Sequence, residues 1–139
     1  MSQALKVLYT AHQNTQGGRD GGTSRSSDDR LNISFSTPGS SGAGTNPEQL
    51  LAAGWSACFI GAMARAASKM KVALPAETAV NAEIDLCLTG DAFFLQARLN
   101  VSLPGLEPSV ARAVADGAHQ ICPYSKATRG NIDVTINVV

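Results

Sequence analysis

The chain has 139 residues, with 11 basic and 11 acidic side chains and 44% hydrophobic residues. This length is typical of one domain, residues 1–139, which can fold without a disulfide or metal scaffold. The zero formal net charge and the lack of basic runs argue against nucleic-acid and membrane partners. No apolar leader follows the first residues, so we expect a cytoplasmic protein whose three cysteines are free for chemistry.

The first part of the chain predicts two strands and two long loops. Apolar side chains recur with period two over residues 5–9 and 31–35, which predicts half-buried antiparallel strands. Loops are expected over residues 12–30 and 37–46, which are rich in Gly, Ser, Thr and Asp. Loops of this length often carry binding or catalytic residues. Composition alone makes the first a flexible surface loop, although the glycines on both sides of Arg19 would let its guanidinium approach a ligand closely.

A long helix is predicted next. Thr45 and Glu48 have the spacing of a capping box, Pro47 suits a first helical turn, and the helix should end near residues 69–71. The uncharged apolar stretch over residues 50–64 is shorter than the roughly 20 residues of a membrane span, so we interpret it as a core helix. Because this helix is apolar on nearly all sides, other elements must wrap around it.

The last part of the chain predicts a hairpin, a second helix and a final strand. Alternating apolar residues over 82–88 and 95–103 predict antiparallel strands that turn at residues 89–92. An amphipathic helix is expected over residues 108–122, where the next proline stops it, and a further half-buried antiparallel strand over residues 132–138. Strands and helices that do not alternate regularly favour the α+β class over a doubly wound parallel sheet.

The three cysteines lie in different contexts. Cys87 falls on the polar side of its strand with no cation or second thiol near it in sequence, so we interpret it as incidental. Cys58 lies in the middle of the apolar helix and Cys122 at the end of the second helix, and position alone makes either an inert core residue. The two histidines, one of them His119 in an H-x-x-C spacing with Cys122, do not complete a zinc site. We therefore expect no metal and no cofactor.

A reactive thiolate at Cys58 would need help from elsewhere in the chain. Burial among apolar side chains raises the pKa of a thiol, and Cys58 lies too far from the helix N-terminus for the helix dipole to lower it. A cation from a loop would supply the missing stabilisation. Arg19 is the candidate, and Glu48 in the first helical turn could orient its guanidinium through paired hydrogen bonds.

Four stretches of the sequence resemble the organic hydroperoxide resistance (Ohr) proteins of the Ohr/OsmC family. They span almost the whole chain in order: Gly17 to Gly21, Gly44 to Leu50, Ala52 to Phe59, and His119 to Asn131. The two cysteine contexts together are specific, and they favour the Ohr branch over the OsmC branch. The departures are mild: Trp55 stands where a smaller aromatic residue is frequent, Asp29 where glycine is frequent, and Lys126 where asparagine is common.

The resemblance implies a thiol-dependent peroxidase that acts on organic hydroperoxides, including fatty-acid hydroperoxides. Cys58 would match the peroxidatic cysteine and Cys122 the resolving cysteine, which form a disulfide with each other. Arg19 would match the arginine that stabilises the thiolate and the leaving oxygen, and Glu48 the residue that holds it. The family's reductant is a dithiol of the lipoyl type, dihydrolipoamide or a lipoylated protein. Its fold is an intertwined α+β homodimer, with two central helices wrapped by antiparallel sheets.

Two functions of other classes stay open at this point. In a thiol-based redox sensor, a peroxide would oxidise the cysteines once, without turnover, and the disulfide would change the shape offered to a partner. In a binding module for hydrophobic ligands, replacing Cys58 would leave binding intact. Peroxide consumption with dihydrolipoamide, measured with and without the two cysteines, distinguishes all three.

Overall fold

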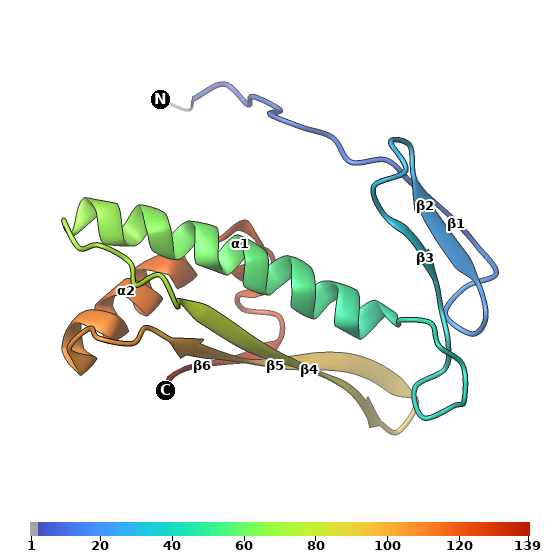
Figure 1. Cartoon of the computed structure of the whole chain (residues 1–139). Coiled ribbons are helices and arrows are strands. Elements are labelled where there is room, and N and C mark those ends of the chain that lie inside the picture. The colour runs from blue at the N-terminus through green and yellow to red at the C-terminus, as the bar shows by residue number, and fades with distance from the viewer. Residues whose placement is uncertain (1–2) are drawn as a thin grey trace. The chain divides into compact units, whose positions relative to one another are not determined.

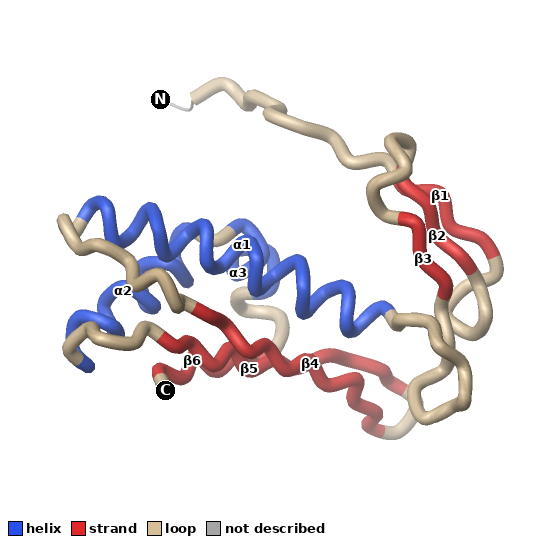
Figure 2. Tube along the Cα trace, in the orientation of Figure 1, coloured by secondary structure: helices blue, strands red, loops and turns tan. Residues whose placement is uncertain are grey.

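A computed structural model describes residues 3–139 as two compact units, the first ending at Pro47 and the second running from Glu48 to Val139. A single domain over residues 1–139 therefore stays a prediction. The expected absence of a leader rests partly on residues 1 and 2, which lie outside the described residues. Figures 1 and 2 show the elements of each unit.

The N-terminal unit holds a small antiparallel sheet of three strands in the order β1-β2-β3. Its strands are β1 (Gln13–Gln16), β2 (Thr23–Ser26) and β3 (Asn32–Ser34). The prediction of a loop over residues 12–30 is therefore wrong, because β1 and β2 form a hairpin there. Both strands consist of polar residues, so hydrophobic alternation could not detect them. In the turn before β3, Asp29 has a φ of 66°, a conformation that favours glycine.

The predicted strand over residues 5–9 is also wrong. Residues 3–12 form no helix or strand, and Leu5 and Tyr9 are 93% and 79% exposed. An alternating segment becomes a strand only where a partner strand satisfies its backbone, and no strand within residues 3–139 pairs with this segment. The centre of the predicted strand over residues 31–35 is confirmed as β3. Residues 37–46 form an irregular loop, as predicted, closed by a bridge between Phe35 and Thr45.

The second unit combines three helices with a three-stranded sheet (Figure 1). Its elements are α1 (Pro47–Lys69), β4 (Ala79–Thr89), β5 (Ala92–Ser102), α2 (Pro108–Ile121), α3 (Pro123–Thr128) and β6 (Asp133–Val138). The predicted long helix, second helix, hairpin and final strand are all confirmed. The short helix α3 was not predicted. Pro123 was interpreted only as the end of α2, but a proline is also a favourable first residue of a helix.

One strand of the second sheet runs in an unexpected direction. β4 and β5 pair in antiparallel register, as predicted, but β5 and β6 are parallel. The prediction of antiparallel pairing for residues 132–138 is thus wrong. The reason is the connection, since α2 and α3 carry the chain back over the sheet before β6 begins, which is the long crossover that parallel neighbours need.

The core of the second unit lies between one face of this sheet and the helices. Figure 1 shows α1 running along the sheet, with α2 beside it. The largest buried side chains come from α1, β5 and α2: Trp55, Phe59, Met63, Leu99, Val101 and Val114. By length and composition alone α1 could cross a membrane, a test that core helices also pass. Its packing against β5 and α2 makes it a core helix.

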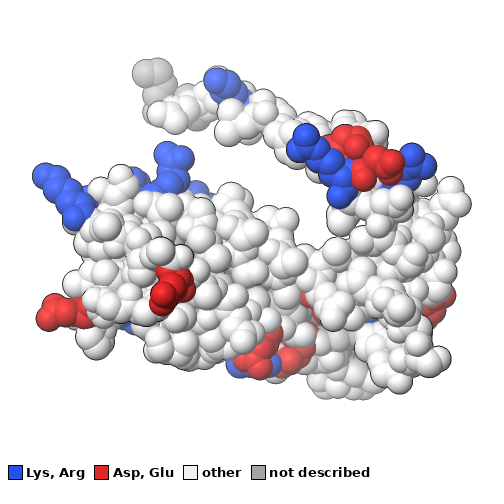
Figure 3. Space-filling view, in the orientation of Figure 1, with Lys and Arg blue, Asp and Glu red and all other residues white. Residues whose placement is uncertain are grey.

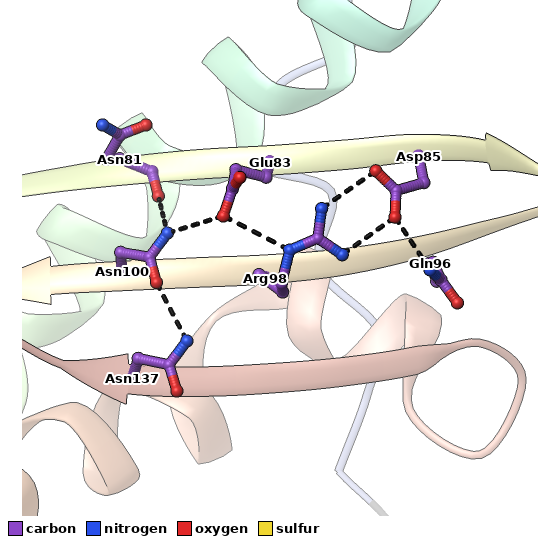
Figure 4. A network of polar contacts seen from close by, with 7 residues as sticks. All are labelled: Asn81, Glu83, Asp85, Gln96, Arg98, Asn100 and Asn137. Carbon is purple, nitrogen blue, oxygen red and sulfur yellow. Dashed lines mark hydrogen bonds and ion pairs between the residues drawn. The ribbon is translucent and has the colours of Figure 1, made fainter.

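The other face of the sheet carries a connected polar network (Figure 4). The Arg98 guanidinium donates two hydrogen bonds to the Asp85 carboxylate, of 2.8 and 2.9 Å, and one of 3.3 Å to Glu83. Asn100 donates to Glu83, and Asn137 on β6 donates to Asn100, at 2.9 Å each. In the space-filling view, acidic and basic side chains mix along the sheet, whereas basic ones stand over the C-terminal end of α1 (Figure 3).

Candidate functional site

Two of the three cysteines meet where α1 contacts the junction of α2 and α3. Cys58 lies half-buried in the middle of α1, and Cys122 is fully buried between the last residue of α2 and the first residue of α3. The Cys122 thiol lies close enough to the Cys58 thiol to influence its pKa. Both are reduced. The proline after Cys122 cannot continue α2, so the chain turns there and presents this thiol to α1.

The surroundings of Cys58 favour its protonated form. Burial is the main cause that raises the pKa of this thiol, and the hydrogen bond with Cys122 and the charge of Cys122 raise it further. The backbone N–H of Tyr124 opposes them by donating toward the sulfur, which lowers the pKa. The direction expected from the apolar helix is thus confirmed. A thiolate at Cys58 requires additional positive charge or a change in its surroundings.

Close contacts hold α3 against α1 beside the two thiols. The indole N–H of Trp55 donates a hydrogen bond of 3.2 Å to the Ser125 hydroxyl, and both residues are fully buried. One residue earlier, a Cβ at Gly54 would lie 3.1 Å from the Tyr124 hydroxyl, so only glycine lets Tyr124 pack so closely. Trp55 therefore contacts α3, the helix that begins directly after Cys122.

An open groove of about 620 Å³ begins at Cys58 and follows α1 toward its C-terminal end. It is lined by Cys58, Gly61, Ala62, Arg65, Lys69, Ile121 and Pro123. The walls near the thiol are apolar, and the far end carries two exposed cations. Arg65 and Lys69 are not among the site residues predicted from the sequence. They lie seven and eleven residues after Cys58, and this helical spacing could have placed them on the same face.

Arg19, the predicted partner of Cys58, lies in the N-terminal unit at the turn between β1 and β2. The turn is tightly built: the backbone N–H of Gly22 donates to the Gly18 carbonyl, at 3.1 Å, and a Cβ at Gly22 would lie 2.3 Å from that oxygen. The next residue, Asp20, accepts a 2.7 Å hydrogen bond from Thr37. The loop around Arg19 is therefore locally constrained, unlike the flexible surface loop expected from composition.

Glu48 lies in the first turn of α1, as predicted. Because Arg19 and Cys58 belong to different units, the interaction of Arg19 with Cys58, and the orientation of Arg19 by Glu48, stay predictions.

The remaining residues considered from sequence lie apart from the groove lining. Cys87 is on β4 opposite Phe94, on the same sheet face as the polar network. His119 is half-buried, and its Nδ1 has no hydrogen-bond partner among residues 3–139. Burial and then the charge of Arg129 lower the pKa of His119. Within those residues, no three acidic, histidine or cysteine side chains gather to hold a metal ion.

Fold and site together define a small α+β protein with a pair of neighbouring thiols, one of which, Cys58, lines an open groove. The family model for OsmC-like proteins matches residues 39–137. An organic hydroperoxide resistance protein of Xanthomonas axonopodis pv. citri is 45% identical, over 99% of this chain and 99% of its own. The crystal structure of the organic hydroperoxide resistance protein OhrB of Bacillus subtilis has a TM-score of 0.89 and 34% identity, covering 96% of this chain and 100% of its own. The chain therefore belongs to the OsmC family, in its organic hydroperoxide resistance branch.

Proposed function

We propose that the protein is a thiol-dependent peroxidase that reduces organic hydroperoxides to alcohols, with Cys58 as the peroxidatic and Cys122 as the resolving cysteine. The observation that carries this proposal is that the two thiols lie close enough to affect the ionisation of Cys58, and a disulfide mechanism requires such proximity. The relatives named for organic hydroperoxide resistance support the substrate class.

The proposed reaction has three steps. The Cys58 thiolate attacks the terminal peroxide oxygen, the O–O bond breaks, and the alkoxide takes a proton and leaves as the alcohol. Cys58 is then a sulfenic acid, and the Cys122 sulfur attacks it, so that an S–S bond forms and water leaves. An external dithiol reduces this disulfide by exchange and becomes a disulfide itself. The sum converts hydroperoxide and dithiol into alcohol, water and oxidised dithiol.

In this proposal Arg19 supplies the positive charge that the raised pKa of Cys58 calls for, and Glu48 orients its guanidinium. A cation beside the sulfur stabilises the thiolate before attack and the developing alkoxide during O–O cleavage. The constrained turn that carries Arg19 supports this role, because a charge held in place needs little reorganisation during the reaction.

The proposed reductant is dihydrolipoamide or a lipoylated protein, and the proposed compartment is the cytoplasm. The thiols must be reduced before each turnover, and reducing cytoplasmic conditions keep them so. A lipoyl dithiol is suited to the task because its two sulfurs lie on one flexible arm, so the second thiol closes the exchange within the same molecule.

The proposed functional unit is a homodimer. Large apolar side chains are exposed on the N-terminal segment and at the tip of the β4–β5 hairpin, among them Leu5, Leu8, Leu88 and Phe93. The apolar α1 also has only part of its surface buried within one chain. Apolar surface of this extent is typical of an association site. A monomer in sedimentation velocity at micromolar concentration would contradict this part of the proposal.

The apolar walls near Cys58 favour organic hydroperoxides over hydrogen peroxide. An alkyl chain gains free energy by leaving water for such walls, whereas hydrogen peroxide has no apolar group to bury. We expect a higher kcat/KM for cumene hydroperoxide than for hydrogen peroxide. Equal values for the two substrates would refute the preference.

The central experiment measures the consumption of cumene hydroperoxide with dihydrolipoamide as the reductant. Cys58→Ser removes the nucleophile and should abolish turnover. Cys122→Ser should leave one fast oxidation of Cys58 but stop the cycle driven by dihydrolipoamide. Cys87→Ser is the matched control, because it also exchanges a half-buried sulfur for oxygen, and it should keep full turnover.

The same assay separates the alternatives. Full turnover by Cys58→Ser would disprove the proposed nucleophile. A single stoichiometric oxidation of the wild-type protein, with no further consumption of peroxide, would instead favour the thiol-based sensor. Absence of any oxidation would favour the binding module for hydrophobic ligands.

A further inference from the structure

One hydrogen bond joins the two helices beside the thiol pair. The indole N–H of Trp55 on α1 donates to the Ser125 hydroxyl on α3, at 3.2 Å, and both side chains are fully buried. Trp55 precedes Cys58 by three residues. Ser125 follows Cys122 by the same number. Because residues three apart are neighbours on a helix surface, this bond lies about one helical turn from each cysteine.

The backbone of Cys122 couples its thiol to the position of α3. Its N–H donates to the carbonyl of Ala118 in α2, at 2.8 Å, and its carbonyl accepts from the N–H of Lys126 in α3, at 3.0 Å. Cys122 is thus held on both sides. Close packing supports the same contact, because a Cβ at Gly54 of α1 would lie 3.1 Å from the Tyr124 hydroxyl of α3. A displacement of α3 along α1 would therefore displace Cys122 as well.

The contact between Trp55 and Ser125 is polar in otherwise apolar surroundings. Among the polar side chains of residues 3–139, only Ser24 and Ser125 are buried, and Ser24 belongs to the N-terminal unit. A buried indole N–H without a partner is costly, so this donor requires its acceptor. A hydrogen bond is also directional, and unlike an apolar contact it favours one position of α3 along α1.

We propose that Trp55 and Ser125 are positioning residues for the resolving step. Their hydrogen bond holds Cys122 beside Cys58, so that the disulfide forms before a second hydroperoxide reaches the Cys58 sulfenic acid. The inference rests on the proposed function and adds the residues that protect its oxidised intermediate.

The Cys58 sulfenic acid has two competing fates. Attack by the Cys122 sulfur forms the S–S bond and releases water, which keeps the protein in its cycle. A second hydroperoxide instead transfers its terminal oxygen to the sulfenic sulfur, so the O–O bond breaks and a sulfinic acid and a second alcohol are formed. Only the first reaction depends on how closely Cys122 is positioned. Misplacement of Cys122 should therefore shift the product toward sulfinic acid.

The test measures the ratio of sulfinic acid to disulfide at Cys58 by mass spectrometry after treatment with excess cumene hydroperoxide. Ser125→Ala removes the acceptor of the hydrogen bond, and Trp55→Phe removes the donor. Each should raise this ratio about tenfold, because a small displacement of a reacting group slows an intramolecular step strongly. The rate of the first oxidation of Cys58 should stay at the wild-type level, since Cys122 takes no part in that step.

A double-mutant cycle separates the hydrogen bond from changes in packing. The double variant Trp55→Phe/Ser125→Ala should have the same ratio as either single variant, since one substitution already removes the interaction. Effects that add would mean that each side chain acts through packing alone, which would overturn the proposal. All ratios are compared well below the thermal midpoint of each variant, so that a loss of stability alone does not change them.

Ser56→Ala is the matched control. It also removes a serine hydroxyl from α1, two residues before Cys58, but this hydroxyl donates within its own helix, to the carbonyl of Ala52 at 2.7 Å. The ratio should therefore stay at the wild-type value. An equal rise in Ser56→Ala would contradict a specific role for the contact between α1 and α3.

The remaining outcomes distinguish this inference from the proposed function. An unchanged ratio in Ser125→Ala or in Trp55→Phe would overturn the positioning role, and either variant alone decides if the other does not fold. A wild-type protein that forms no disulfide between Cys58 and Cys122 would refute the proposed function instead.

Discussion

Two regions of the second unit use positively charged side chains in opposite ways. On the outer face of the sheet, Arg98 is enclosed by the carboxylates of Asp85 and Glu83, and the amides around them complete the network (Figure 4). Along the groove, Arg65 and Lys69 face the space beyond the Cys58 thiol. Carboxylates of the same chain surround the cation on the sheet, whereas no ion pair engages the cations in the groove among residues 3–139.

The difference indicates which charges serve the fold and which serve chemistry. A network that satisfies its own donors and acceptors gains little from a ligand, and its removal costs stability. A charge beside an apolar groove contributes little to stability and much to selectivity. Substitutions in the two regions should therefore have separate effects, one on unfolding and the other on kinetics.

The largest effect that would sharpen this comparison is expected from Arg19→Ala. Loss of the proposed cation should raise the pKa of Cys58 further and slow peroxide reduction at least about tenfold, with little change in thermal stability. The pH dependence of Cys58 alkylation measures the pKa directly. Arg25→Ala is the control, because Arg25 is in the same unit but pairs with Asp29 on the surface. An unchanged rate in Arg19→Ala would mean that another cation serves Cys58.

A smaller effect, on stability alone, is expected from Arg98→Gln. The substitution removes the bidentate contact with Asp85 and leaves two acidic side chains close together, so the thermal midpoint at pH 7 should fall by a few degrees. Turnover should stay at the wild-type level. Arg30→Gln, which touches one highly exposed pair, should change neither quantity. Equal midpoints for the two variants would break the comparison.

The smallest expected effect is a change in how thermal stability depends on pH under acidic conditions. Hydrogen bonds from Arg98 and then Gln96 hold the pKa of Asp85 at about 2, below its usual value of 3.8. Because the pKa of Asp85 is lower in the folded than in the unfolded protein, the ionised carboxylate stabilises the fold. This contribution to the free energy of unfolding is present above about pH 4 and is lost as the pH falls toward 2. Asp85→Asn should flatten this part of a thermal unfolding series between pH 5 and 2. An identical slope in variant and wild type would contradict the assignment.

Much of the fold follows from hydrophobic periodicity, and the failures have more than one cause. The long helix α1 and the β4–β5 hairpin were predicted because their apolar residues report burial directly. Strands β1 and β2 consist of polar residues and gave no such signal. The parallel direction of β6 depends on how α2 and α3 cross the sheet, which is a property of packing rather than of any local pattern.

The site was predictable only where its residues have a characteristic chemistry. Cysteines are few, so Cys58 and Cys122 were singled out before the fold was known, and their proximity followed from the resemblance to a family. Arg65 and Lys69 were missed because cations near a helix C-terminus have an ordinary explanation in the helix dipole. They line a groove only because Ile121 and Pro123, from a distant part of the sequence, lie beside them.

The buried hydrogen bond between Trp55 and Ser125 has an optical consequence. Trp55 is the only tryptophan of the chain, and its indole touches the helix that begins directly after Cys122. Indole emission depends on local polarity and on nearby sulfur atoms. A shift of Cys122 toward Cys58, which the proposed disulfide requires, should therefore change the emission of this single tryptophan, so that the proposed oxidation and reduction can be followed in real time without an added label.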